Sequence, residues 1–140
     1  MKSTLIYWPM LVQMMIPLIV LALNGKRKAA DRRSGSHDPA ESAINNTAWT
    51  LPVVLTSNNL ANQFQFPIVF YGLCLILAHI GGVTMVTLGL AWAYVVGRVF
   101  HAYVHVTSNH IPKRFGSFIT TMLILLGFFI ATVIQLAKVS

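Results

Sequence analysis

The sequence predicts an all-α integral membrane protein, a four-helix bundle formed by a single domain of residues 1–140. Three observations predict this class. Apolar residues make up 56% of the chain and charged residues only 9%, whereas soluble domains carry about 25% charge. The apolar residues gather in four segments, each long enough for a helix that crosses a bilayer. The basic residues lie between these segments, as they do beside transmembrane helices, which argues against a nucleic-acid-binding surface.

The first predicted helix covers residues 5–23, a run of 19 residues without a charge. Pro9 and Pro17 should kink it, as membrane helices tolerate. Gln13 lies between the prolines and is expected to form an interhelical hydrogen bond or to line a site. The run is long, lacks an A-x-A cleavage site and ends against basic residues. It therefore indicates a retained helix rather than a signal peptide.

A polar loop, residues 24–50, is predicted to follow this helix. It holds every acidic residue of the chain and half of the basic residues. Its composition is typical of a mobile segment. Its basic residues are Lys26, Arg27, Lys28, Arg32 and Arg33.

The second predicted helix covers residues 58–80, with Ser57 or Asn58 as its N-cap. Asn58, Asn62 and Gln65 are spaced four and three residues apart, so they are expected on one face of its first turns. After these turns the segment becomes apolar.

Turn-forming residues predict how the remaining helices are connected. Pro67 should bend the second helix. Gly81–Gly82 predicts a tight turn, so the second helix should form a hairpin with a third helix, residues 83–106. A short basic connection, residues 107–114, leads to a fourth apolar helix, residues 115–136.

The distribution of Lys and Arg predicts the orientation in the membrane. One face carries eight basic residues, from the first loop and from the end of the third helix with its connection. The other face carries only Lys2 and Lys138. The loops 24–50 and 107–114 are therefore expected in the cytoplasm and both termini on the far side, in the inner membrane if the cell is bacterial. The polar start of the second helix and the polar end of the third then share one depth.

A polar stripe marks the end of the third helix. Arg98, His101, His105 and Asn109 fall within one narrow arc of that helix, with Tyr94 one turn below Arg98. Polar groups on one side of a membrane helix usually face a bundle or a wet cavity, which makes them a functional-site hypothesis. In the alternative interpretation these side chains extend to the lipid headgroups at a helix end.

Several kinds of chemistry are not favoured by these residues. His101 and His105 are four residues apart, a spacing at which two histidines of a helix can coordinate one metal ion, but no Asp or Glu lies near them in the sequence. His79 is expected at the opposite membrane face, which argues against a haem held by two histidines. Cys74, alone in an apolar segment, is interpreted as a core residue. We therefore expect no metal and no haem. No Ser-His-Asp arrangement, carboxylate pair or phosphate loop is evident either.

What remains is a cationic pocket rich in hydrogen-bond donors. Arg98, His101, His105 and Arg114 would form it, with amides from the second helix. Such a pocket suits an anionic, peptide-like or carboxylated small molecule, because arginine binds carboxylates bidentately. A cation beside a bound thiol also favours the thiolate, which is the nucleophilic form.

Two segments carry a resemblance to a known family. The run N-Q-F-Q-F-P-I-V-F-Y, residues 62–71, and the pattern R-x-x-H-x-x-x-H-x-x-x-N, residues 98–109, accompany four helices and a basic first loop. Together they resemble the MAPEG family, the membrane-associated proteins in eicosanoid and glutathione metabolism, and in particular its short bacterial branch. The resemblance covers essentially the whole chain, and the pattern of the third helix is its most specific part.

The resemblance implies a homotrimer that binds glutathione between neighbouring subunits near the cytoplasmic face. Arg98 matches the family's arginine of the third helix. His101 and His105 stand where the leukotriene-synthase branch has glutathione-contacting tyrosines, and Asn62 resembles the asparagine of the second helix. Gln65 is the nearest counterpart of a family glutamate that can pair with the glutathione amino group. Glutamine cannot supply that ion pair.

The resemblance also implies an activity. A glutathione transferase or peroxidase would activate glutathione as co-substrate for attack on a lipophilic electrophile or peroxide arriving from the bilayer. Arg98 or Arg114 would stabilise the thiolate, and the other site residues would bind the peptide: Asn62, Gln65, Tyr94, His101, His105 and Asn109. The alternative is a non-catalytic membrane protein, either a lipid-binding accessory or a small subunit of a larger membrane complex. The departure at Gln65 favours that alternative.

Overall fold

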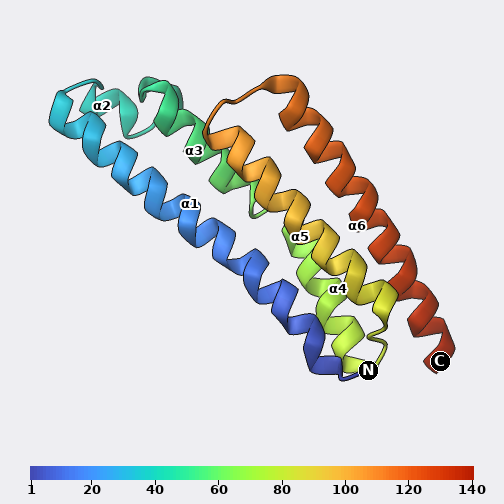
Figure 1. The fold of residues 1–140 in the computed structure, drawn as a ribbon. Helices are drawn as coiled ribbons and strands as arrows, with labels where there is room; N and C mark the ends of the chain where they lie inside the picture. Colours follow the sequence, from blue (N-terminus) through green and yellow to red (C-terminus); the bar gives the residue numbers. More distant parts are fainter.

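The computed structural model describes all 140 residues as a bundle of long helices without strands. Four segments are long and apolar enough to cross a membrane, which confirms the predicted all-α membrane class. The two termini lie at the same end of the bundle (Figure 1). In chain order the elements are η1 Ser3–Ile6, α1 Tyr7–Ser34, α2 Pro39–Ser42, η2 Asn46–Ala48, α3 Leu51–Asn62, α4 Pro67–His79, α5 Met85–Val106 and α6 Ile111–Val139.

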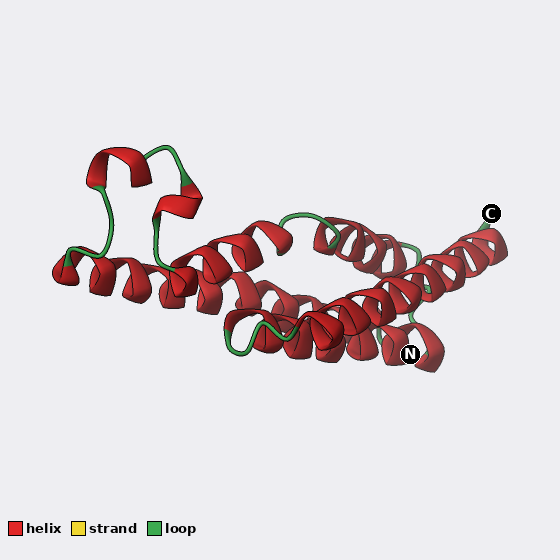
Figure 2. Cartoon of the chain, turned by 90° about the horizontal axis from the view of Figure 1, so that it is seen from above, coloured by secondary structure: helices red, strands yellow, loops and turns green.

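The first long helix extends beyond its predicted end at residue 23. Helix α1 continues through the basic segment to Ser34, so only the second half of the predicted loop 24–50 is irregular. Lys, Arg and Ala are strong helix formers, and two arginines in the last turn suit the negative end of the helix dipole. Gly35 ends the helix with φ 66°, a left-handed conformation that favours glycine. The short elements α2 and η2 then arch away from the bundle (Figure 2).

Two side chains of this extension fix it to the other helices. The Arg27 guanidinium donates to the carbonyl oxygens of Pro52 and Val106, each at 2.8 Å. The Asp31 carboxylate accepts hydrogen bonds from the backbone N–H of Thr50 at 3.1 Å and from its hydroxyl. Thr50 is the N-cap of α3. The α1 extension therefore holds the start of α3 and the end of α5 together.

The predicted helix 58–80 is in fact two helices, α3 and α4, separated by residues 63–66. Helix α3 begins at Leu51 after Thr50, rather than near Ser57, because Pro52 suits the first turn of a helix. Pro67 was expected to bend the segment, and the structure instead has a break before it. Proline lacks the N–H that a continuous helix needs, and its ring clashes with the carbonyl four residues earlier.

Helices α5 and α6, the third and fourth helices of the prediction, run side by side and are connected by a short turn at residues 107–110 (Figure 1). Helix α5 begins with a capping box between Thr84 and Thr87. Helix α6 begins at Ile111, earlier than the predicted residue 115, because Pro112 occupies its first turn. The His110 ring accepts the backbone N–H of Lys113 as its cap. The predicted connection 107–114 is therefore half helical.

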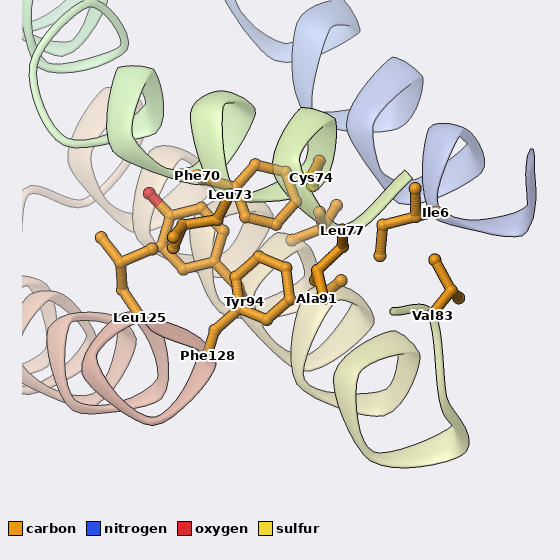
Figure 3. Close-up of a cluster of buried hydrophobic side chains, with 11 residues drawn as sticks. Ile6, Phe70, Leu73, Cys74, Leu77, Val83, Ala91, Tyr94, Leu125 and Phe128 are labelled. Atoms are coloured by element: carbon orange, nitrogen blue, oxygen red, sulfur yellow. The ribbon is translucent and has the colours of Figure 1, made fainter. Parts of the chain in front are cut away.

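The apolar core fills the half of the bundle nearer the termini. Phe70 of α4 stacks on Tyr94 of α5 with ring centroids 4.7 Å apart, and Phe128 of α6 packs at 5.6 Å from Phe70 (Figure 3). Ile6 and Leu77 close this cluster towards the N-terminus and are fully buried. Tyr94, predicted as a site residue, therefore belongs to the apolar core.

Candidate functional site

A buried arginine lies at the centre of the bundle, beside the helix break. The Arg98 side chain is 0% exposed. Its Nη2 donates to the carbonyl oxygen of Asn62 and to Oε1 of Gln63, each at 3.2 Å. Because the break ends α3, the Asn62 carbonyl lacks a helical partner, and the guanidinium supplies one. Within this chain Arg98 does not extend towards lipid headgroups.

A hydrogen-bonded chain of amides connects this arginine to the end of α5. Gln63 Nε2 donates to Asn59 Oδ1 at 3.1 Å, and Asn59 Nδ2 lies 3.2 Å from His105 Nδ1. Gln13 Nε2 donates to Gln63 Oε1 at 3.4 Å, so the predicted interhelical hydrogen bond of Gln13 is confirmed. Three helical segments are thus joined by side chains that are all buried.

The first histidine of the stripe, His101, faces α6. His101 Nδ1 lies 3.1 Å from the carbonyl oxygen of Arg114 and 3.1 Å from the Ser117 hydroxyl. The ring centroids of His101 and His105 are 5.8 Å apart. The two imidazoles are therefore neighbours, each anchored through Nδ1 to a different part of the bundle.

A cavity of about 290 Å³ lies between the helix break, the end of α5 and the start of α6. Its polar wall consists of Asn62, His101, His105 and Arg114, all predicted as site residues. Its apolar wall consists of Ile111, Phe115 and Phe118. No carboxylate lines the cavity. The cavity therefore combines hydrogen-bonding and cationic groups with an apolar surface.

Two polar atoms at this cavity lack a partner within the chain. Asn62 Oδ1 and His101 Nε2 are both buried and make no hydrogen bond. Buried polar atoms are nearly always hydrogen-bonded in folded proteins. A ligand in the cavity would supply the missing partners once the atoms that cover Asn62 Oδ1 and His101 Nε2 move aside.

The remaining predicted site residues do not line the cavity. Arg98 and Tyr94 lie in the interior of the bundle. Asn109, in a left-handed conformation with φ 47°, accepts a hydrogen bond from Arg114 Nη1 at 2.7 Å and so holds that arginine. Gln65 is exposed on the outside of the break.

Sequence reasoning missed the two amides that face inward. Asn59 and Gln63 are buried, whereas Asn58 and Gln65 are exposed. The predicted face assumed one continuous helix from residue 58, but the break at residues 63–66 interrupts that face, and the sequence does not show which side of α3 packs inward. The signal that could have indicated them is their spacing, since Asn59 and Gln63 lie four residues apart and Gln63 lies four residues before Pro67.

The structure contains no group of three or more His, Cys, Asp or Glu side chains that could hold a metal ion. The three acidic residues, Asp31, Asp38 and Glu41, all lie in α1 beyond the apolar run or in α2 and its cap. The chemistry of the cavity is therefore that of arginine, imidazole and amide groups.

Comparison with known proteins gives one match. The family model described as MAPEG family matches residues 5–134. No curated protein and no solved structure matches the chain significantly.

Proposed function

The chain belongs to the MAPEG family, and from this premise we propose that it is a membrane-bound thiol transferase or peroxidase that uses glutathione. The observation that supports the proposal most strongly is the cavity wall, where Arg114, His101, His105 and Asn62 converge beside three apolar side chains. A thiol peptide needs the polar wall, and a lipophilic co-substrate needs the apolar one.

Arg114 is the group we assign to the reacting thiol. One of its nitrogens is held by Asn109, and the side chain makes no other hydrogen bond within the chain, so donors remain for a ligand. A guanidinium beside a thiol favours the thiolate. In a transferase reaction the thiol loses its proton to water, the sulfur forms a bond to an electrophilic carbon, and the leaving group departs with the electrons of the broken bond.

The proposed assembly is a homotrimer with the cavity towards the cytoplasm. The cavity lies at the end of the bundle that carries the basic α1 extension, and the Lys and Arg count supports a cytoplasmic position for that end. Many large apolar side chains of the single chain are exposed, including Trp8, Leu18 and Leu123. Lipid and neighbouring subunits would cover them.

One observation favours a non-catalytic role. The cavity has no carboxylate to pair with the amino group of glutathione, and Gln65, the nearest counterpart of the family glutamate, is exposed and does not line it. An accessory protein or a small subunit of a larger membrane complex would need no such ion pair. Copurification with another membrane protein at fixed stoichiometry, without thiol-dependent activity, would support this second function.

The matched pair Asn62→Ala and Asn58→Ala tests whether the cavity binds the thiol. Asn62 has an unpartnered buried oxygen at the cavity, whereas Asn58, one turn earlier, is exposed. Losing one hydrogen bond costs about 0.5–1.5 kcal/mol. We therefore expect Asn62→Ala to weaken glutathione binding roughly 2- to 12-fold in calorimetry and Asn58→Ala to leave it unchanged. Equal affinities for the two variants would argue against this cavity as the site.

A further inference from the structure

The amide chain that begins at Arg98 has only one possible direction. A guanidinium donates hydrogen bonds and cannot accept them. The Gln63 atom 3.2 Å from Arg98 must therefore be the amide oxygen, which turns the amide nitrogen of Gln63 towards Asn59. Asn59 receives that N–H through its oxygen, so its own nitrogen faces His105. Gln13 also donates to the same Gln63 oxygen, which agrees with this direction.

The direction of this chain determines the tautomer of His105. The Asn59 nitrogen, which is a donor, lies 3.2 Å from His105 Nδ1. Nδ1 must then accept, and a neutral imidazole carries its single proton on the other nitrogen. His105 therefore has an Nε2–H group, and the residue lines the cavity.

His101 has the opposite tautomer for a separate reason. Its Nδ1 lies 3.1 Å from the carbonyl oxygen of Arg114, which can only accept a hydrogen bond. The Ser117 hydroxyl donates to that same carbonyl at 2.9 Å and can accept from the ring. His101 Nδ1 therefore carries the proton, and its buried, unpartnered Nε2 is an acceptor.

We propose that Arg98 is a positioning residue that fixes the proton on His105 through Gln63 and Asn59, without touching any ligand. The two histidines, one helical turn apart and both lining the same cavity, then carry one ring donor, His105 Nε2–H, and one ring acceptor, His101 Nε2, which other atoms cover in this structure. This pair fits a ligand group that can both accept and donate, such as a secondary amide or a neutral thiol. The assignment of that group to a thiol peptide rests on the proposed function, whereas the tautomers do not.

Nuclear magnetic resonance of the full-length protein, labelled with ¹⁵N-histidine and held in nanodiscs, tests the tautomers directly. The ¹⁵N shifts of the two ring nitrogens distinguish a protonated from an unprotonated nitrogen. We expect the proton on Nε2 of His105 and on Nδ1 of His101, with assignments from the signals lost in His105→Asn and His101→Asn. A His105 ring protonated on Nδ1, or one that exchanges between tautomers, would overturn the proposal.

Asn59→Asp provides the decisive variant. A carboxylate can only accept, so His105 must place a proton on Nδ1, whether or not Nε2 stays protonated, while His101 keeps its tautomer. Asn58→Asp introduces the same charge on an exposed neighbour and should change neither ring. An unchanged His105 tautomer in Asn59→Asp, or an equal change in Asn58→Asp, would contradict the proposed direction of these hydrogen bonds.

Arg98→Met tests whether Arg98 sets the direction of the amide hydrogen bonds. Without the guanidinium, the Gln63 amide can turn over, and we expect His105 to populate both tautomers, whereas Arg98→Lys keeps a donor and should keep the wild-type tautomer. If Arg98→Met does not fold, Gln63→Met interrupts the same chain. A fixed His105 tautomer in a folded Arg98→Met or Gln63→Met protein would show that Arg98 does not fix the proton on His105 through Gln63 and Asn59. Because no thiol is present, this result is independent of glutathione binding.

Discussion

Replacing Arg114 by alanine is expected to reduce kcat/KM for thiol conjugation roughly 10- to 150-fold, the equivalent of about 1.5–3 kcal/mol for a charge-assisted hydrogen bond. Arg114 lines the cavity and is held in place by Asn109. In Arg114→Ala the thiol would lose the cation that favours its thiolate. Conjugation assays on the purified protein in detergent, with several lipophilic electrophiles, measure the effect.

Two further variants define what Arg114 contributes. Arg114→Lys keeps the charge but not the planar fork, so we expect it to recover only a minor part of the activity. Arg33→Ala removes the same charge from an exposed position near the end of α1 and should leave activity unchanged. Similar losses in Arg33→Ala and Arg114→Ala would indicate a general effect of net charge and would contradict the assigned role.

Gly97→Ala is expected to destabilise the bundle by about 1–3 kcal/mol, the usual cost of overpacking. A Cβ atom at Gly97 would collide with the side chain of Thr121 on α6, which is 0% exposed. Helices α5 and α6 both line the cavity, so separating them should also weaken ligand binding. Thermal unfolding in detergent, monitored by circular dichroism, measures the loss.

A control and a rescue accompany this variant. At Gly89, on the same helix, an added Cβ meets nothing within 4 Å, so Gly89→Ala should be neutral or stabilising, as alanine is in helices. The atom nearest to the Gly97 position is Cγ2 of Thr121. Thr121→Ser removes that atom, and the double variant with Gly97→Ala should regain most of the stability. Absence of rescue would show that the close approach is not the cause.

The number and type of membrane helices could be predicted from the sequence because apolar length and basic flanks are local properties. The end of α1 was placed too early because the change to charged residues was interpreted as a loop, although Lys, Arg and Ala favour a helix and Arg27 and Asp31 make contacts that support the extension. The break before Pro67 changed a predicted bend into two helices. A proline indicates that a helix is disturbed, but the surrounding packing decides how far.

The site was predictable in its residue types and less so in its geometry. The stripe of α5 correctly placed His101 and His105 on one side, because helical periodicity alone determines that arrangement. The depth of Arg98 was not predictable, since the same spacing suits a side chain in a cavity or one tied to a broken helix. Asn59 and Gln63 were missed because the sequence does not show which side of the second helix packs against α1 and α5.

The central claim, that the cavity between α3, α5 and α6 binds a thiol peptide, is tested most directly by calorimetric titration of glutathione into the purified protein in nanodiscs. We expect saturable binding to the wild-type protein, weakened roughly 10- to 150-fold in Arg114→Ala and unchanged in Arg33→Ala. The absence of binding to the wild-type protein, or equal affinity in Arg114→Ala, would contradict the claim.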